Sequence, residues 1–399
     1  MGKRNFILWA AVIVAVAFGL REWFVLTMVV PEPNQGDVGA YLRYALHLAR
    51  DGTFSQTAGP PVPDAFRAPG YPWMLRLLLP DDNWSDGRWF AAIYQAQVLL
   101  GTATVAGVIA LARRWMTPGF ALLAGLLMAV QAHNIAATGE ILTEVLFGAL
   151  LVGALLARSW GAGGLFGLAY LTNPVIAPVP FVLAALKRDR AALAMVAVLC
   201  VVIGGWAMRN TLVHAKGGRA AMNFVEGSWP EYHDMAKRQW QYPTKLGTMN
   251  HEQAVFARDA RAGLHLVADR LLSEPGRYAA WYAGKPFLLF DWDIRIGQRT
   301  VFTVAMDDTT LDGPLLGLVV VQWVLNPLVF ALAFCGIVLG LVRGGTERTV
   351  AVTILVLTAI HTVLQAEPRY AIPYRSLEIL LATSAIAYMT QAMPREAVR

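Results

Sequence analysis

Asp37 and Arg67 are the residues of this chain whose types and setting point most clearly to chemistry. Asp37 stands in the segment GDVGAY at 36–41, and Arg67 stands in FRAPGYPW at 66–73, between the first and second long apolar runs. A carboxylate can take a proton from a hydroxyl group, and the planar, forked donors of arginine suit a phosphate. Insertion into a membrane requires neither residue, so the pattern predicts chemistry at a membrane surface.

Further polar residues stand near the ends of apolar runs that we expect to reach the same side of the membrane. They are His133, Asn134, Glu140, Glu144, Asn173, Arg209, Asn210, Glu367 and Arg369. Ionisable groups at membrane depth are costly and mark functional sites by default. Arginines on the outer side also run against the positive-inside bias, which favours a local reason such as an anionic ligand.

Several of these residues also have an ordinary structural interpretation. Asp37 precedes a predicted helix and suits its N-cap, a role that leaves one carboxylate oxygen for a substrate. Arg67 and Arg209 would serve as interfacial anchors, and Arg369 would be a snorkelling side chain. Residue type and position leave both interpretations open.

Glu140 and Glu144 are four residues apart, which predicts two carboxylates on one face of a helix near its outer end. Glu140 would interact with the helix N-terminus, with Thr138 as the cap. Glu144 would lie about one turn deeper, where it needs a partner such as Arg21 or Arg67, or a water-filled cavity. Glu144 is therefore a candidate for the site.

The metal-ligating residue types show no clear pattern. The seven histidines lack metal-like spacing, and the two cysteines, Cys200 and Cys335, stand inside apolar runs. We interpret the cysteines as small core residues, His133 as a polar turn residue and His361 as a core histidine. A divalent cation held by Asp37 and a glutamate stays open on ligand type, but the sequence requires no cofactor.

Composition places these residues in a polytopic membrane protein. Of 399 residues, 56% are hydrophobic and only 15% are charged, whereas soluble domains carry about 25% charged residues. We predict an all-α fold of about ten transmembrane helices, because several apolar runs reach the roughly 20 residues that cross a bilayer. The predicted spans are 5–29, 89–112, 118–135, 140–158, 161–172, 174–187, 190–208, 314–342, 349–365 and 370–391. The two spans that flank Asn173-Pro174 would form either one broken helix or two short ones.

The distribution of positive charge predicts the orientation. With the N-terminus in the cytoplasm, the short inner loops hold many lysines and arginines, as the positive-inside rule expects. These are Arg113, Arg114, Arg158, Lys187, Arg188, Arg190, Arg343, Arg348, Arg395 and Arg399. The net charge of +6 then reflects loop anchoring, and we find no nucleic-acid motif. Lys3 and Arg4 precede an apolar run that lacks a small-residue cleavage pattern, which favours a retained helix over a signal peptide.

This orientation divides the chain into three regions. They are an N-terminal transmembrane module (1–208), an outer loop region (209–313) and C-terminal transmembrane helices (314–399). The first outer loop, 30–88, should carry two helices in the membrane interface, because the apolar residues of 38–49 share one helical face and Pro69 and Pro72 frame a second helix. The region 209–313 should be mostly helical, with helices near 251–272 and 275–290.

The ordered set of motifs resembles the C-fold glycosyltransferases, the polytopic enzymes that use polyprenyl-phosphate sugars. This broad group includes protein mannosyltransferases and the aminoarabinose transferases of lipid A. The motifs are GDVGAY with Arg43 (36–43), GTF (52–54), RAPGYP (67–72), TEVLF (143–147), GLAYLTNP (167–174), WAMRN (206–210) and PRY with Pro373 (368–373). Family members often carry arginine where Asn173 stands. The chain is also shorter than larger relatives, which leaves its acceptor open.

The resemblance implies an inverting hexosyl or pentosyl transfer from a polyprenyl-phosphate donor to a lipid, glycan or protein acceptor. The enzyme would lie in a bacterial inner membrane, in contact with its lipids and with a periplasmic site. Asp37 would be the catalytic base, and Glu144 would assist. The substrate-binding residues would be Arg43, Arg67, Tyr71, Glu140, Arg209, Asn210, Arg369 and Tyr370, with arginines holding the departing phosphate.

A lipid or sugar transporter, or a flippase, is the alternative function. The break at Asn173-Pro174 favours it, whereas the lack of related halves and the position of the acids near one interface do not. A non-catalytic scaffold would explain the spans but not the clustered charge.

Overall fold

The structure, a computed structural model, is helical over the residues that it describes, with one isolated β-bridge between Val29 and Asp307. The described residues are 1–31, 34, 36–79, 87–215, 218–296, 300–307 and 309–392. Arg395 and Arg399, predicted for the inner side, lie outside them. The α-helices are α1 (Lys3–Thr27), α2 (Gly36–Arg50), α3 (Gly70–Leu77), α4 (Gly87–Ala112), α5 (Pro118–Ala129), α6 (Ala132–Ala136), α7 (Glu144–Leu156), α8 (Ser159–Thr172), α9 (Pro178–Lys187), α10 (Arg190–Leu212), α11 (Arg219–Gly227), α12 (Tyr232–Lys237), α13 (Pro243–Arg258), α14 (Ala260–Ser273), α15 (Pro275–Leu289), α16 (Leu316–Arg343), α17 (Gly345–Val363) and α18 (Arg375–Ala392). The 3₁₀ helices are η1 (Ala137–Gly139), η2 (Pro174–Ile176), η3 (Gln239–Gln241) and η4 (Pro368–Tyr374).

Five of the described helices are long and apolar enough to cross a membrane: α1, α4, α10, α16 and α17. A sixth span results if α5 and the helical segment 132–139, which meet at a bend of 55°, are counted together. The predicted count of about ten is therefore not confirmed, because several predicted spans correspond to short helices. The stretch 161–187 forms two of them, α8 and α9, separated by extended backbone at Asn173.

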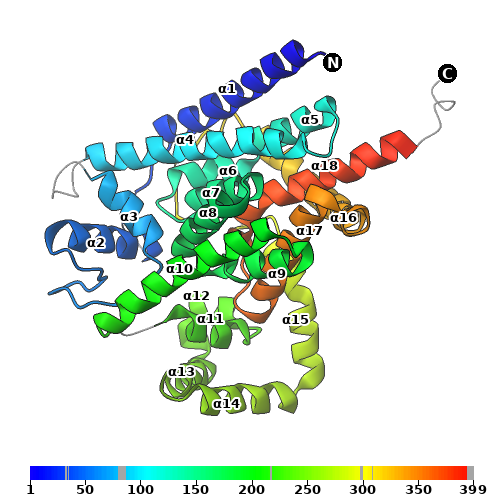
Figure 1. Ribbon diagram of the computed structural model, residues 1–399. Coiled ribbons are helices and arrows are strands. Elements are labelled where there is room, and N and C mark those ends of the chain that lie inside the picture. Colours follow the sequence, from blue (N-terminus) through cyan, green and yellow to red (C-terminus); the bar gives the residue numbers. More distant parts are fainter. Residues whose placement is uncertain are drawn as a thin grey trace.

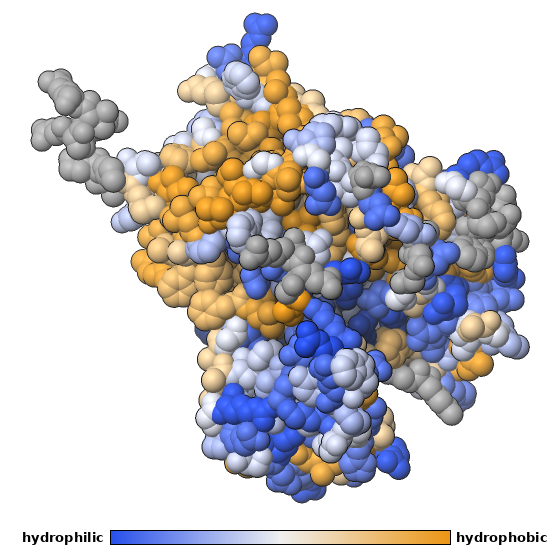
Figure 2. Space-filling model, turned by 180° about the vertical axis from the view of Figure 1, so that it is seen from behind, coloured by the Kyte–Doolittle hydropathy of each residue, from blue (hydrophilic) through white to orange (hydrophobic). Residues whose placement is uncertain are grey.

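Much of the surface of the long helices is apolar. Leu8, Val201 and Val324 are each more than 60% exposed on α1, α10 and α16. In Figure 2 apolar residues cover most of the upper body of the molecule, whereas polar residues gather over the helices at the bottom, α11–α14 in Figure 1. A belt of exposed apolar side chains on long helices is what lipid contact requires, so the chain is a multi-pass membrane protein.

The two helices predicted within 30–88 are present as α2 and α3, which pack against each other beside one end of α4 and α10 (Figure 1). Gly36 opens α2 with a φ of 57°, a left-handed conformation that favours glycine. Gly70 opens α3 so close to α8 that a Cβ atom would lie 2.8 Å from the carbonyl oxygen of Leu171. These two glycines let the chain turn into the helices that carry and support Asp37 and Arg67.

The region 209–313 is mostly helical over its described residues, as predicted, and α15 matches the predicted helix 275–290. The helix predicted near 251–272 is wrong in its extent, because the chain breaks at Asp259 into α13 and α14. The Asp259 carboxylate accepts hydrogen bonds from the backbone amides of Arg261 and Ala262, which begins a new helix.

Cys200 and Cys335 are free and exposed, so their predicted place in the core is wrong. A lipid-facing surface and a protein core are both apolar, and hydropathy alone therefore does not separate them.

Candidate active site

Asp37 lies between two arginines from distant parts of the chain. Arg67, in the loop before α3, donates from Nη2 to Oδ1 of Asp37 at 2.6 Å. Arg369, in η4, donates from Nη2 to Oδ2 at 3.0 Å. The structure thus brings together three of the predicted site residues, and the carboxylate contacts arginines in place of the predicted cap interaction.

The field of these cations keeps Asp37 ionised. Burial disfavours the charged form, but the guanidinium groups of Arg369, Arg67 and Arg219 hold the pKa of the carboxyl well below its ordinary value. The Asp37 side chain is 24% exposed, so a ligand can still reach it. The carboxylate is therefore charged and partly open to the site.

Glu144 joins the same group through Arg369. Its Oε1 lies 3.7 Å from Nε of Arg369, and the side chain is 10% exposed at the first residue of α7. The predicted partners Arg21 and Arg67 are wrong for this carboxylate. Arg21 is fully buried and donates to backbone carbonyls of Ala17, Met128 and Ala129.

Several guanidinium N–H groups around Asp37 are buried without a hydrogen bond. They are Nε and Nη1 of Arg67, Nε of Arg219 and Nε of Arg369. Buried donors without acceptors are costly, and an anion placed among them would satisfy them. Sequence reasoning missed Arg219, because it stands in the region 209–313, where charges of both signs are mixed and no motif marks it.

Two cavities adjoin this cluster. One has a volume of about 320 Å³ and is bordered by Asp37, Leu142 and Val304. The other has a volume of about 360 Å³ and is bordered by Tyr232, His233 and Glu367. Arg295, Thr303 and Arg369 line both, so the cavities meet beside the cation that pairs with Asp37.

An apolar groove runs away from the site between α3, α7, α8 and α10. It has a volume of about 580 Å³, and its lining includes Met74, Leu146, Leu171 and Val202. Pro69, two residues after Arg67, stands at its edge. A long apolar chain attached to an anion could place the anion at the arginines and its tail in this groove.

Two other predicted site residues are buried beside the cluster. Glu140 precedes α7 with an extended backbone, so its predicted place on the same helical face as Glu144 is wrong. Burial raises the pKa of Glu140 to about 7, although its carboxylate accepts a hydrogen bond from the backbone amide of Thr303. Tyr71 is fully buried, and its hydroxyl donates to Gln97 at 3.0 Å.

The remaining predicted residues contact other parts of the chain. Arg43 donates to the carbonyl of Gln56 at 2.8 Å. Arg209 donates to the carbonyl of Asp64 at 2.8 Å and to the side chain of Asn210 at 3.0 Å, which ties the end of α10 to the first outer loop. The Tyr370 hydroxyl donates to Gln365 at 3.2 Å, and the Tyr370 ring lies 5.3 Å from the Arg369 guanidinium.

Comparison with solved structures reveals a shared fold. AglB, an archaeal oligosaccharyltransferase from Archaeoglobus fulgidus in complex with an inhibitory peptide and a dolichol-phosphate, aligns with 98% of this chain at 13% identity and a TM-score of 0.51. ArnT from Cupriavidus metallidurans, bound to undecaprenyl phosphate, aligns with 99% of this chain and 82% of its own, at 15% identity and a TM-score of 0.39. The likeness to AglB confirms the predicted C-fold.

This chain spans about half the length of AglB, covering 51% of it. No protein-family model matches the sequence, and no curated protein does.

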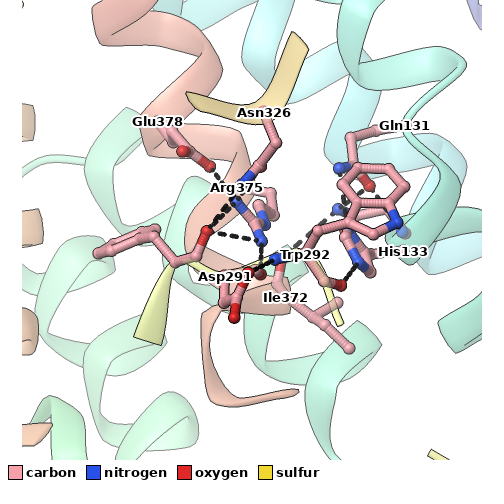
Figure 3. Close-up of polar contacts among 10 residues, drawn as sticks. Gln131, His133, Asp291, Trp292, Asn326, Ile372, Arg375 and Glu378 are labelled. Atoms are coloured by element: carbon pink, nitrogen blue, oxygen red, sulfur yellow. Dashed lines mark hydrogen bonds and ion pairs between the residues drawn. The ribbon is translucent and has the colours of Figure 1, made fainter. Parts of the chain in front are cut away.

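A buried polar network holds η4, the segment that carries Arg369 (Figure 3). Arg375, 2% exposed, donates to the carbonyl of Asp291 at 2.6 Å and to Glu378 at 2.8 Å. His133, predicted as a turn residue, is fully buried and contacts the carbonyl of Trp292 at 2.8 Å. The network fixes the start of α18 against the segment after α15, and Arg369 stands six residues before Arg375.

Among the described residues, no group of three or more His, Cys, Asp or Glu side chains is arranged to hold a metal ion. Both carboxylate oxygens of Asp37 already contact guanidinium groups. The Asp37 carboxylate therefore faces cations that the chain itself supplies.

Proposed function

We propose that this chain is a membrane glycosyltransferase that moves a sugar from a polyprenyl-phosphate donor to an acceptor hydroxyl. The observation that carries the proposal is the Asp37 carboxylate set between Arg67 and Arg369, beside buried guanidinium donors that lack acceptors. The fold shared with AglB and the apolar groove next to Arg67 also support it.

Asp37 is the general base in this proposal. It takes the proton of the acceptor hydroxyl while that oxygen forms a bond to the anomeric carbon of the donor sugar. The bond between the anomeric carbon and the phosphate oxygen breaks, and the electron pair leaves with the polyprenyl phosphate. Attack from the face opposite the phosphate inverts the anomeric configuration, which NMR of the product would reveal.

The arginines bind the phosphate and stabilise the charge that grows on it. Arg67 and Arg219 have N–H groups without an acceptor for this role, and Nε of Arg369 has the Glu144 carboxylate 3.7 Å away, beyond hydrogen-bond distance. A bound phosphate would also offset part of the positive field at Asp37. The pKa of Asp37 would then rise toward the range in which a carboxylate is a useful base, so donor binding and base activation are coupled.

Glu144 contacts Nε of Arg369 while Asp37 contacts Nη2, so the two carboxylates together keep the guanidinium in place. The polyprenyl tail occupies the groove between α3, α7, α8 and α10, and the acceptor enters through the two cavities that meet at Arg369. We further propose that the site faces the periplasm of a bacterial cell. Labelling of a cysteine at Asp51, in a cysteine-free variant, by an impermeant maleimide on intact cells would test this orientation.

Asp37→Asn is the direct test of the base. We expect transfer to fall by about 10² to 10⁴, the usual contribution of a general base, while membrane insertion and thermal unfolding stay near wild type. Asp51→Asn is the matched control, because Asp51 follows the same helix, is exposed, and pairs with partly buried His47 at 2.9 Å. Wild-type transfer by a correctly inserted Asp37→Asn variant would remove Asp37 as the base.

The same preparations separate transfer from transport. Reconstituted vesicles should release polyprenyl phosphate and form a glycosylated product. Movement of a labelled donor across the bilayer with its headgroup intact, and without product, would favour the flippase instead.

A further inference from the structure

A separate cavity lies at the opposite end of the helices that reach the candidate active site. It has a volume of about 470 Å³ and opens where α7 and α9 end and where α8, α10 and α17 begin. Glu144 begins α7 at the active-site end, and α7 has 13 residues. The two ends of this helix are therefore about 20 Å apart, less than the roughly 30 Å of a bilayer's hydrocarbon core.

Two tight turns place cations at the rim of this cavity. Arg158 stands in the turn from α7 to α8, and Lys187 ends α9 just before the turn to α10. Each turn contains a non-glycine residue in the left-handed conformation, Ser159 with φ 51° and Arg188 with φ 52°. Both turns are short, so the positions of the two cations relative to the helices are well defined.

The positive charge of this cavity is only partly balanced within it. Neither the Arg158 nor the Lys187 side chain makes a hydrogen bond or salt bridge with the described residues, although the Asp189 carboxylate attracts Lys187 from a distance. Arg114 adds a third cation within electrostatic reach of Lys187, and its guanidinium donates to the last carbonyls of α7. The carboxylate in the lining, Asp189, accepts a hydrogen bond from a backbone amide in the first turn of α10 at 2.7 Å. Arg158 and Lys187 in the lining, with Arg114 nearby, thus outnumber the one carboxylate of the lining, that of Asp189.

The walls of the cavity are apolar. Leu155, Phe166, Leu183 and Met195 line it beneath the charged rim. A cationic rim over apolar walls fits a ligand with an anionic head and a hydrocarbon body. Basic pockets between transmembrane helices bind lipid head groups in this way, whereas a water-soluble anion would gain nothing from the apolar walls.

We propose that this cavity binds an anionic phospholipid, with its phosphate at Arg158 and Lys187 and the first part of its acyl chains against Phe166 and Met195. The lipid would bridge the two turns and hold the far ends of α7 to α10 together. The proposal rests on the membrane location of the chain and is independent of glycosyl transfer.

The test measures thermal unfolding of the full chain in detergent as lipid is added. We expect dioleoylphosphatidylglycerol to raise the unfolding temperature with saturation, and dioleoylphosphatidylcholine or inorganic phosphate to have little effect. Arg158→Gln/Lys187→Gln should weaken the apparent affinity for the anionic lipid at least about ten-fold. Arg188→Gln/Arg190→Gln is the control. It also removes two positive charges, from the turn between α9 and α10, but at residues that do not line the cavity.

Three results would overturn the proposal. They are equal stabilisation by the two lipids, an equal loss of affinity in the control variant, and stabilisation by inorganic phosphate alone. Arg158→Gln by itself covers the case in which the double variant does not purify, because Arg158 is exposed. This single variant should still bind the anionic lipid more weakly than wild type, and unchanged binding would also refute the proposal.

Discussion

Replacing Arg369 with glutamine removes the cation that lies between the two carboxylates of the candidate active site. Its guanidinium is 3.0 Å from Asp37 and 3.7 Å from Glu144. At an effective dielectric constant of about 20, unit charges 3.0 Å apart attract by ~5.5 kcal/mol. Desolvation offsets part of this, and removing one partner of a buried pair usually costs about 3–5 kcal/mol. The lower end of this energy range applies to the pair of Arg369 and Asp37, because the Asp37 side chain is 24% exposed.

The effect on catalysis should appear in both the rate and its pH dependence. Losing one donor to the departing phosphate should lower kcat by about 10² to 10³. In the wild type the cations hold the pKa of Asp37 well below its ordinary value, so the base stays ionised as pH falls. Without Arg369 that pKa rises, and the carboxyl is protonated at a higher pH. The variant should therefore lose rate as pH falls through a range in which the wild type stays flat.

The assay is transfer from a polyprenyl-phosphate sugar, followed at several pH values with wild type, Arg369→Gln and Asp37→Asn. Arg76→Gln, on α3 and outside the cluster, controls for the loss of a nearby positive charge. The double variant Asp37→Asn/Arg369→Gln should be little slower than Asp37→Asn alone, because the two groups act together. A lower rate with an unchanged pH profile, or fully additive losses, would refute the coupling between Arg369 and the base.

Three further outcomes follow from the same geometry. Gly205 lines the apolar groove and has open space at its Cβ position, so Gly205→Phe should fill the groove. The variant should raise KM for a long-chain donor about ten-fold, which corresponds to the loss of roughly two buried CH₂ groups. KM for a short-chain donor and the neighbouring variant Gly204→Phe should show little change, and equal effects on both donors would argue against a tail in the groove. Burial raises the pKa of Glu140 to about 7, so ionisation of Glu140 destabilises the folded wild type as pH rises from 5 to 8. The unfolding temperature of Glu140→Gln should therefore increase relative to that of the wild type over this range. Parallel plots of unfolding temperature against pH for the two proteins would contradict this. Chelation of divalent metal by EDTA should leave transfer unchanged, because guanidinium groups already contact both oxygens of Asp37, and a loss restored by Mg²⁺ or Mn²⁺ would show that a metal takes part.

Local sequence patterns predicted much of the fold. The apolar runs at 5–29, 89–112 and 314–342 correspond closely to α1, α4 and α16, because a continuous apolar stretch of that length fixes a helix by itself. The helix-forming stretch at 36–50 and the Pro-Gly start of α3 were also visible. The exposure of Cys200 was not, because it depends on which neighbours a helix meets. The break at Asp259 is a local N-cap that the helical pattern of 251–272 did not reveal.

The candidate site shows the same division. The sequence by itself determined that Asp37 and Arg67 stand between the first two apolar runs and that Glu144 and Arg369 stand near the ends of apolar segments, where charge is costly and needs a reason. Only the tertiary structure decided that Arg67 and Arg369 contact the two oxygens of the Asp37 carboxylate and that Arg219 lies within electrostatic reach of it. It also decided that Tyr71 and Arg209 form hydrogen bonds with other parts of the chain. The physical reason is that an ion pair between residues 332 positions apart in the chain depends on how helices pack, and no local pattern of residues records that packing.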